Sequence, residues 1–193
     1  LFLDSSMMYS SAIYPNEEST LEEAAEYKLE AICQKLDLQA DDHVIEIGTG
    51  WGGFACYAAS KYGCKVTTTT ISTEQYNKAI ERVIAHGLED KVVVLFEDYR
   101  NLQGKYDKLV SIEMIEAVGH EFYESYFSKC SDLLKPSGKM LIQSILMSDQ
   151  RYNRARKHVD FIKRYIFPGG CLPSITEISR HIESDTDMHI LQI

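Results

Sequence analysis

Six consecutive residues carry the clearest sign of ligand binding in this sequence, Gly48-Thr49-Gly50-Trp51-Gly52-Gly53. They follow a short apolar run at 44–47 and precede a segment of helical composition. Glycine at these positions permits a tight turn and lets the backbone approach a ligand closely. The order GxGxGG departs from the dinucleotide fingerprint GxGxxG, which disfavours a pyrophosphate site. A tight connection between a strand and a helix would also explain the glycines, so the turn alone leaves the ligand open.

An acidic residue within the apolar run narrows the choice. Glu46 stands two residues before Gly48, between hydrophobic neighbours. A buried carboxylate is costly unless it is paired or hydrogen-bonded. Methyltransferases that use S-adenosylmethionine commonly have an acid at this place, where a cationic cofactor or backbone amides would compensate its charge. Glu46 therefore favours S-adenosylmethionine as the ligand of the turn.

The next predicted strand, the β-branched run at 65–70, ends without the acid that often binds a ribose. The chain instead reads Thr70-Ile71-Ser72-Thr73-Glu74-Gln75. A ribose contact would then come from Thr70 and Gln75. Ser72 and Gln75 also match a capping box, the pattern that begins many helices. Both roles, capping and ligand contact, stay open for Gln75.

The elements that must position these residues alternate along the chain. Runs rich in β-branched or apolar residues predict strands at 44–47, 65–70, 92–96 and 108–112, and a fifth from 140 after a turn at 136–138. Helical patterns predict helices at 20–36, 54–62, 72–86, 121–134 and 175–182. This alternation predicts an α/β fold with a mainly parallel central sheet and helices on both faces. In such sheets ligands bind beyond the carboxyl ends of the strands.

Length and composition suit one soluble domain spanning residues 1–193. Of these residues 45% are hydrophobic and 25% are charged, and the net charge of −9 argues against nonspecific nucleic-acid binding. The five cysteines form no CxxC pair, so we expect no disulfide framework, no metal site and a cytoplasmic location. The chain begins at Leu1 without methionine. We therefore expect a fragment that lacks an N-terminal region and the C-terminal end of the full protein.

Several stretches together resemble the cyclopropane fatty acid synthases and mycolic acid cyclopropane synthases. They follow the order of that family and are spread over nearly the whole chain, at 9–12, 44–53, 70–75, 98–100, 116–119 and 165–174. The resemblance implies a Rossmann-like class I methyltransferase fold with S-adenosylmethionine as cofactor. It also implies the residues that contact the cofactor: Tyr9, Ser10, Glu46, Gly48, Thr49, Gly50, Trp51, Gly52, Thr70, Ile71, Gln75, Tyr99 and Arg100.

The same resemblance implies the substrate and the reaction. The substrate is an unsaturated acyl chain of a phospholipid, whose alkene attacks the sulfonium methyl group. Loss of a proton from the new methyl closes a cyclopropane ring, and a bound bicarbonate ion is the proposed base. Loss of a proton elsewhere would give a methyl- or methylene-branched chain instead.

The pocket for this base departs from the family pattern. Glu116 and Ile145 match the glutamate and isoleucine of the family, whereas Ser11 stands in place of a cysteine and Gln143 in place of a histidine. Gln143 can donate a hydrogen bond to an anion but cannot carry positive charge. We therefore expect a pocket that holds bicarbonate less well, formed by Ser11, Glu116, Gln143 and Ile145.

A basic stretch from Arg151 to Arg164 stands out in this acidic chain. It would attract anionic lipid headgroups and place the protein at the inner membrane face, although a solvated helix face would explain it as well. Two other functions stay open: methyl transfer to a small polar N or O acceptor, and lipid binding by a relative that has lost catalysis. The sequence leaves the oligomeric state open, a homodimer included.

Overall fold

The computed structural model describes residues 3–193. The chain divides into two compact units. The first unit comprises Leu1–Val110 and Leu134–Leu141, and the second comprises Ser111–Leu133 and Ile142–Ile193.

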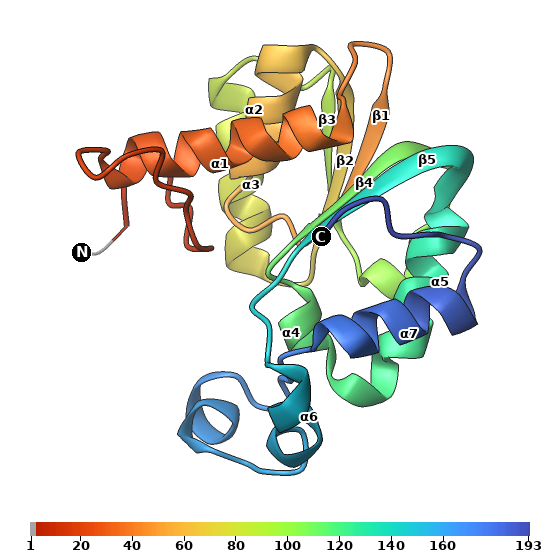
Figure 1. Cartoon of the computed structure of the whole chain (residues 1–193). Helices are drawn as coiled ribbons and strands as arrows, with labels where there is room; N and C mark the ends of the chain where they lie inside the picture. Colours follow the sequence, from red (N-terminus) through yellow and green to blue (C-terminus); the bar gives the residue numbers. More distant parts are fainter. Residues whose placement is uncertain (1–2) are drawn as a thin grey trace. The chain divides into compact units, whose positions relative to one another are not determined.

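A five-stranded sheet with helices around it forms the framework (Figure 1). The strands are β1 (His43–Ile47), β2 (Lys65–Thr70), β3 (Val92–Phe96), β4 (Tyr106–Ile112) and β5 (Leu134–Gln143), in the order β3-β2-β1-β4-β5. The pairs β1–β2, β1–β4 and β2–β3 are parallel. β1 and β2 are the most buried strands, in keeping with their nearly continuous apolar or β-branched sequences. The predicted α/β class is confirmed.

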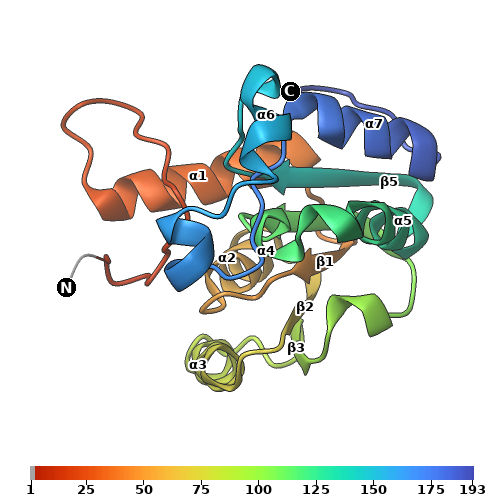
Figure 2. The same ribbon diagram turned by 90° about the horizontal axis from the view of Figure 1, so that it is seen from below.

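Helices α1 (Leu21–Leu36), α2 (Gly53–Tyr62) and α3 (Thr73–Ala85) belong to the first unit. α2 and α3 both pack on β2 and β3, and α1 packs on α2. Both views show the three helices on the same side of strands β1 to β3 (Figures 1 and 2). The predicted capping box of α1 is present, because Thr20 accepts from the amide of Glu23 and the Glu23 carboxylate accepts from the amide of Thr20.

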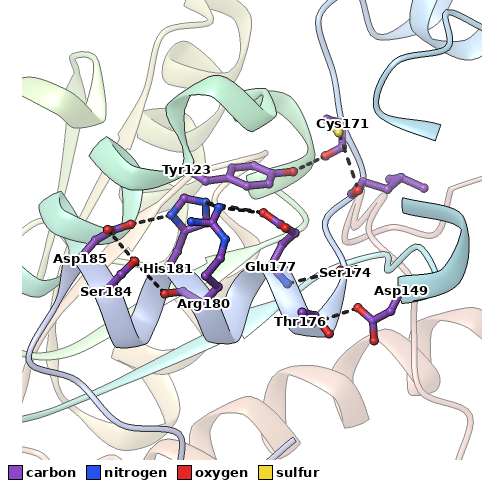
Figure 3. A network of polar contacts seen from close by, with 11 residues as sticks. Tyr123, Asp149, Cys171, Ser174, Thr176, Glu177, Arg180, His181, Ser184 and Asp185 are labelled. Carbon is purple, nitrogen blue, oxygen red and sulfur yellow. Dashed lines mark hydrogen bonds and ion pairs between the residues drawn. The ribbon is translucent and has the colours of Figure 1, made fainter. Parts of the chain in front are cut away.

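The second unit holds α4 (Ile115–Val118), α5 (Tyr123–Leu133), α6 (Asp149–Ala155), α7 (Ile175–Asp185), the short turn His120–Phe122 and a single π-helical turn at Ile162–Ile166. α5 packs on α7. Figure 3 shows the polar network along α7. Buried His181 bonds to Asp185 through Nδ1 at 2.5 Å, and Tyr123 Oη donates to the Cys171 carbonyl at 2.7 Å. The bond from Tyr123 joins the segment at Cys171 to the start of α5.

The predicted turn at 136–138 is wrong, because these residues belong to β5. β5 lies at the edge of the sheet, where a proline is tolerated since its missing N–H need not join a strand ladder. All five cysteines are free and buried. Among residues 3–193, no helix is both long and apolar enough to cross a membrane.

Candidate functional site

Three connections follow the carboxyl ends of neighbouring strands in the first unit. β1 leads into the glycine turn, β2 leads into residues 71–72 before α3, and β3 leads into the 3₁₀ turn Tyr99–Asn101. Because these strands are parallel and adjacent, the three connections lie along one edge of the sheet. The predicted cofactor residues of the three loops are therefore brought to the same edge.

Two hydrogen bonds fix the glycine turn to β2. The amides of Gly48 and Thr49 both donate to the Thr69 carbonyl, at 3.2 and 3.0 Å. Gly48, Gly50 and Gly52 have φ angles of 99°, 52° and 81°, a region that L side chains rarely adopt. A Cβ on Gly50 would lie 3.6 Å from Tyr9 Cε1, so the tyrosine ring lies against the turn. The turn is thus a preformed glycine cradle with an aromatic side chain beside it.

Replacing Gly52 by alanine is expected to lower the free energy of unfolding by about 2–3 kcal/mol. The alanine would have to adopt the positive φ of Gly52, 81°, which is strained for a residue with a side chain. Its methyl group would lie 3.2 Å from Cα and Cβ of Ala79 on α3. Gly87→Ala is the matched control, since Gly87 also has a positive φ, of 63°, but nothing within 4 Å of its Cβ position. Urea unfolding of both variants measures the difference. Equal losses would show that contact with Ala79 does not matter.

Glu46 is buried and is connected to this turn through Thr68. It is 2% exposed, and Thr68 Oγ1 donates to its Oε2 at 2.6 Å. Thr68 Oγ1 also lies 2.8 Å from Thr49 Oγ1. Each hydroxyl has one hydrogen, so when Glu46 is ionised Thr49 donates to Thr68 and Thr68 donates to Glu46. Burial raises the pKa of Glu46 to about 8, and the bond from Thr68 opposes this rise.

The side chain of Gln75 does not complete the predicted capping box. Ser72 does cap α3, because its hydroxyl accepts from the Gln75 amide. The Gln75 side chain instead accepts from Thr70 Oγ1 at 2.9 Å through Oε1 and donates to Tyr9 Oη at 3.5 Å through Nε2. Gln75 therefore links the end of β2 to the N-terminal segment. Ile71, which follows β2, is exposed.

The N-terminal segment 8–10 runs along the glycine turn. A Cβ on Gly53 would lie 2.6 Å from Met8 Cε, and Tyr9 lies against Gly50. Ser10 is buried at 9% exposure, whereas Tyr9 is 56% exposed. The segment thus places the exposed Tyr9 ring beside the cradle, and a buried hydroxyl follows it in the chain.

Arg100 is fixed by Asp98 at the end of β3. Its Nε and Nη2 donate to the two carboxylate oxygens at 2.9 and 2.6 Å, and Asp98 also caps the turn that begins at Tyr99. The hydrogen bonds from Arg100 hold the pKa of Asp98 below its usual value. This pair gives the loop a defined shape near the edge of the sheet.

In the second unit, Glu116 and Ile145 are in direct contact. The Ile145 amide donates to Glu116 Oε1 at 2.6 Å, while Oε2 is buried without a hydrogen-bond partner. Burial raises the pKa of this carboxyl, and the bond from Ile145 opposes the rise. The Cys171 amide donates to the Glu116 carbonyl at 2.8 Å, which fixes α4 to the following segment.

Gln143 bonds to a different acid. Its side-chain Nε2 donates to Glu113 Oε1 at 2.9 Å, and its backbone carbonyl accepts from the backbone amide of Glu113 at 2.8 Å. Glu113 has a φ of 48°, uncommon for a residue with a side chain. Glu116, Gln143 and Ile145 thus belong to the second unit. Ser11 belongs to the first unit, where it is exposed beside Ser10.

Sequence patterns missed three residues at these places: Thr68, Glu113 and Lys28. Thr68 is one threonine among four in a row, and only the polar Glu46 opposite it in the parallel register hints at its role. Glu113 follows a strand without any motif. Lys28 is a charged residue at a core position of α1, four residues after Ala24 and four before Ile32, and that interruption of the apolar stripe was the available signal.

Comparison with known proteins gives one consistent result. The sequence matches the family described as mycolic acid cyclopropane synthetase over residues 1–193. It is 42% identical to the cyclopropane-fatty-acyl-phospholipid synthase of Escherichia coli (strain K12), over 94% of this chain and 45% of that protein. It is 39% identical to the tuberculostearic acid methyltransferase UfaA1 of Mycobacterium tuberculosis, over 92% of this chain and 43% of that protein. The chain therefore spans less than half the length of these relatives.

Solved structures agree with the sequence matches. The mycolic acid cyclopropane synthase CmaA1, solved in complex with SAH and CTAB, superposes with a TM-score of 0.89 at 30% identity, over 99% of this chain and 70% of that one. The cyclopropane synthase MmaA2 from Mycobacterium tuberculosis gives the same TM-score at 26% identity and the same coverage. These likenesses confirm the predicted Rossmann-like class I methyltransferase fold.

Proposed function

Because the chain belongs to the mycolic acid cyclopropane synthetase family, we propose that the full protein transfers a methylene group from S-adenosylmethionine to the double bond of an unsaturated phospholipid acyl chain. The observation that carries this proposal is the buried Glu116 Oε2, an acceptor without a partner next to a carboxylate oxygen that is already held. Such an acceptor is suited to hold the bicarbonate ion, the proposed base that takes the last proton of the reaction.

The glycine cradle suits the cofactor. S-adenosylmethionine, when bound, supplies an electrophilic methyl group. The cofactor could approach the backbone of the turn closely, since the glycines have no Cβ to obstruct it. The turn residues that we propose to contact it are Gly48, Thr49, Gly50, Trp51 and Gly52. The other residues that we propose to contact it are Tyr9, Ser10, Glu46, Thr70, Ile71, Gln75, Tyr99 and Arg100.

The base pocket suits bicarbonate in part. Glu116 Oε2 can accept the hydrogen of a bicarbonate ion, and the amide of Gln143 can donate to one of its oxygens. Gln143 is already bonded to Glu113, however, and neither residue carries positive charge. We propose that bicarbonate binds beside Glu116 and Gln143, but less tightly than in a pocket with a histidine. The contact expected from Ser11, which belongs to the first unit, stays a prediction.

Cofactor carrying a CD₃ group tests the function with vesicles of unsaturated phospholipid. In the reaction the alkene's π electrons form a carbon–carbon bond to the methyl carbon as its bond to sulfur breaks. Loss of one hydron from that carbon leaves the electron pair that forms the second carbon–carbon bond of the ring. A cyclopropane therefore retains two deuterons, whereas a methyl branch retains three. A methylene branch also retains two, but ozone cleaves it and not the ring. A protein that binds the cofactor but yields no alkylated acyl chain would contradict the proposal.

The two other candidate functions are outcomes of the same experiment. A methyltransferase of small polar acceptors would bind S-adenosylmethionine and leave the acyl chains unlabelled. A lipid-binding relative without catalysis would bind vesicles and show no labelled product of any kind. The buried carboxylate oxygen of Glu116 argues against a relative without catalysis. The 42% identity to the cyclopropane-fatty-acyl-phospholipid synthase of Escherichia coli favours an acyl chain over a small polar acceptor.

We further propose contact with a membrane surface through the apolar segment 159–167. Six of its large apolar side chains are between 50% and 66% exposed: Val159, Phe161, Ile162, Tyr165, Ile166 and Phe167. Exposed cations accompany them, Arg154 and Lys157 before the segment and Arg164 within it. Apolar side chains among cations are the composition of segments that lie in an anionic lipid interface.

Reversing Arg154 and Lys157 to glutamate is expected to weaken binding to anionic vesicles at least tenfold, and less so as salt increases. Arg156 is left unchanged, because its Nε is buried and its guanidinium stacks over Tyr152. Lys35→Glu with Lys65→Glu is the control, since it alters two exposed lysines of the first unit by the same charge. Vesicle sedimentation measures both, and equal binding by the two double variants would contradict membrane contact here.

A further inference from the structure

A lysine lies entirely within the core of the first unit. Lys28, in the middle of α1, is 0% exposed and sits on the same helix face as Ala24, Ala25 and Ile32. Lysine is almost never fully buried unless it is paired, because removing its charge from water is costly. An apolar residue would fill this position at lower cost, so the charge calls for an explanation beyond packing.

One contact of this lysine joins α1 to the residue that follows Tyr9. Lys28 Nζ lies 2.6 Å from Ser10 Oγ, and this hydrogen bond is buried. An ammonium group has three donors and no acceptor, so Ser10 must accept. The single hydrogen of the Ser10 hydroxyl is therefore directed elsewhere, as a donor. A positive charge behind the oxygen also makes that hydroxyl a stronger donor.

The same bond secures the N-terminal segment beside the turn. Ser10 directly follows Tyr9, which lies against Gly50 and bonds to Gln75. The next attachment along the chain joins the Ile13 amide to the Ala24 carbonyl at 3.3 Å. Lys28 is thus a buried side-chain anchor of this segment on α1, in addition to the exposed bond from Ser5 Oγ to Glu22 Oε1 at 2.6 Å.

We propose that Lys28 is a positioning residue for the cofactor. It holds Ser10 so that the hydroxyl donates to an anionic group of the ligand, with the buried charge behind it. S-adenosylmethionine carries one such group, the carboxylate of its methionyl end, and its ammonium and sulfonium groups would be repelled by the same charge. This inference rests on the proposed use of that cofactor.

Lys28→Met in the full-length protein separates positioning from a purely structural role. Methionine is unbranched and apolar and fits a core position, so the variant should fold, and its urea midpoint reports what the lost hydrogen bond contributes to stability. The Kd for S-adenosylmethionine, measured by calorimetry, should rise at least tenfold. The Kd for the decarboxylated cofactor should hardly change, because the group that Ser10 recognises is missing. Lys35→Met, on the exposed face of the same helix, should leave both constants unchanged.

Ser10→Ala keeps the test independent of how Lys28→Met folds. It should weaken binding of S-adenosylmethionine by a similar factor, and the double variant should be no worse than either single one. Wild-type affinity in Ser10→Ala, or in a folded Lys28→Met, would overturn the inference. So would equal losses for the two cofactors. If the unsubstituted protein binds no S-adenosylmethionine, the proposed function fails first and the role of Lys28 with it.

Discussion

Replacing Glu116 by glutamine is expected to lower the formation of alkylated acyl chains by about 100- to 10,000-fold, the usual contribution of a group that assists proton transfer. The amide oxygen can still accept from the Ile145 amide, as Oε1 does at 2.6 Å. The other position becomes an NH₂ donor, so the acceptor that Oε2 provides is lost. Labelled product per unit time, quantified by mass spectrometry, measures the effect.

Glu121→Gln is the matched control for this variant. It makes the same carboxylate-to-amide change in the second unit, at a side chain that is 65% exposed and pairs with His120. It should retain wild-type activity. Binding of S-adenosylmethionine should be unchanged in both variants, because the proposed cofactor residues lie in the first unit. Wild-type product formation by Glu116→Gln would remove this residue from the proposed chemistry.

The second large effect concerns pH and Glu46. The pKa of Glu46 is raised to about 8 by burial, whereas it has its ordinary value near 4.5 in the unfolded chain. Between these values the folded state holds a proton that the unfolded state has released. The free energy of unfolding therefore falls as pH rises from about 4.5 to about 8. In Glu46→Gln this contribution disappears.

The variant should thus match the wild type near pH 4.5 and exceed its stability near pH 8 by roughly 3–5 kcal/mol. Thr68 can still donate to the amide oxygen, so the packing around the side chain is preserved. Other groups also titrate in this range, and the informative quantity is therefore the difference between the two urea curves at each pH. Glu89→Gln, at an exposed acid of the first unit, should run parallel to the wild type. A Glu46→Gln curve parallel to the wild type would contradict a raised pKa.

Elements whose pattern is local were predictable from the sequence. β2 is a run of β-branched residues, and α1 begins at the capping box of Thr20 and Glu23. The glycine turn was predictable because backbone geometry there demands a residue without Cβ. The glycine cradle, the two neighbouring loops after β2 and β3 and the class of cofactor were all predicted from such local features and from the resemblance to a known family.

What the sequence could not provide depends on partners distant in the chain. The hydrogen bond between Gln75 and Tyr9 joins residues far apart in sequence, and the local pattern could not decide between capping and ligand contact for that side chain. Gln143 was expected in one pocket with Glu116, which stays a prediction. One N–H of its amide donates to Glu113, whose positive φ has no sequence signature. The π-helical turn at Ile162–Ile166 likewise follows no periodic pattern that could have announced it.

The burial of all five cysteines makes this chain a convenient background for site-specific labelling. Desolvation raises the pKa of Cys33 to about 12 and those of Cys56 and Cys64 to about 11, and it raises those of Cys130 and Cys171 as well. Thiolates are the reactive species, so these side chains should react slowly with maleimides in the folded state. A cysteine introduced at Phe161, which is 65% exposed, would be the readily modified thiol of residues 3–193. An environment-sensitive fluorophore attached there would report directly whether that position enters a lipid interface.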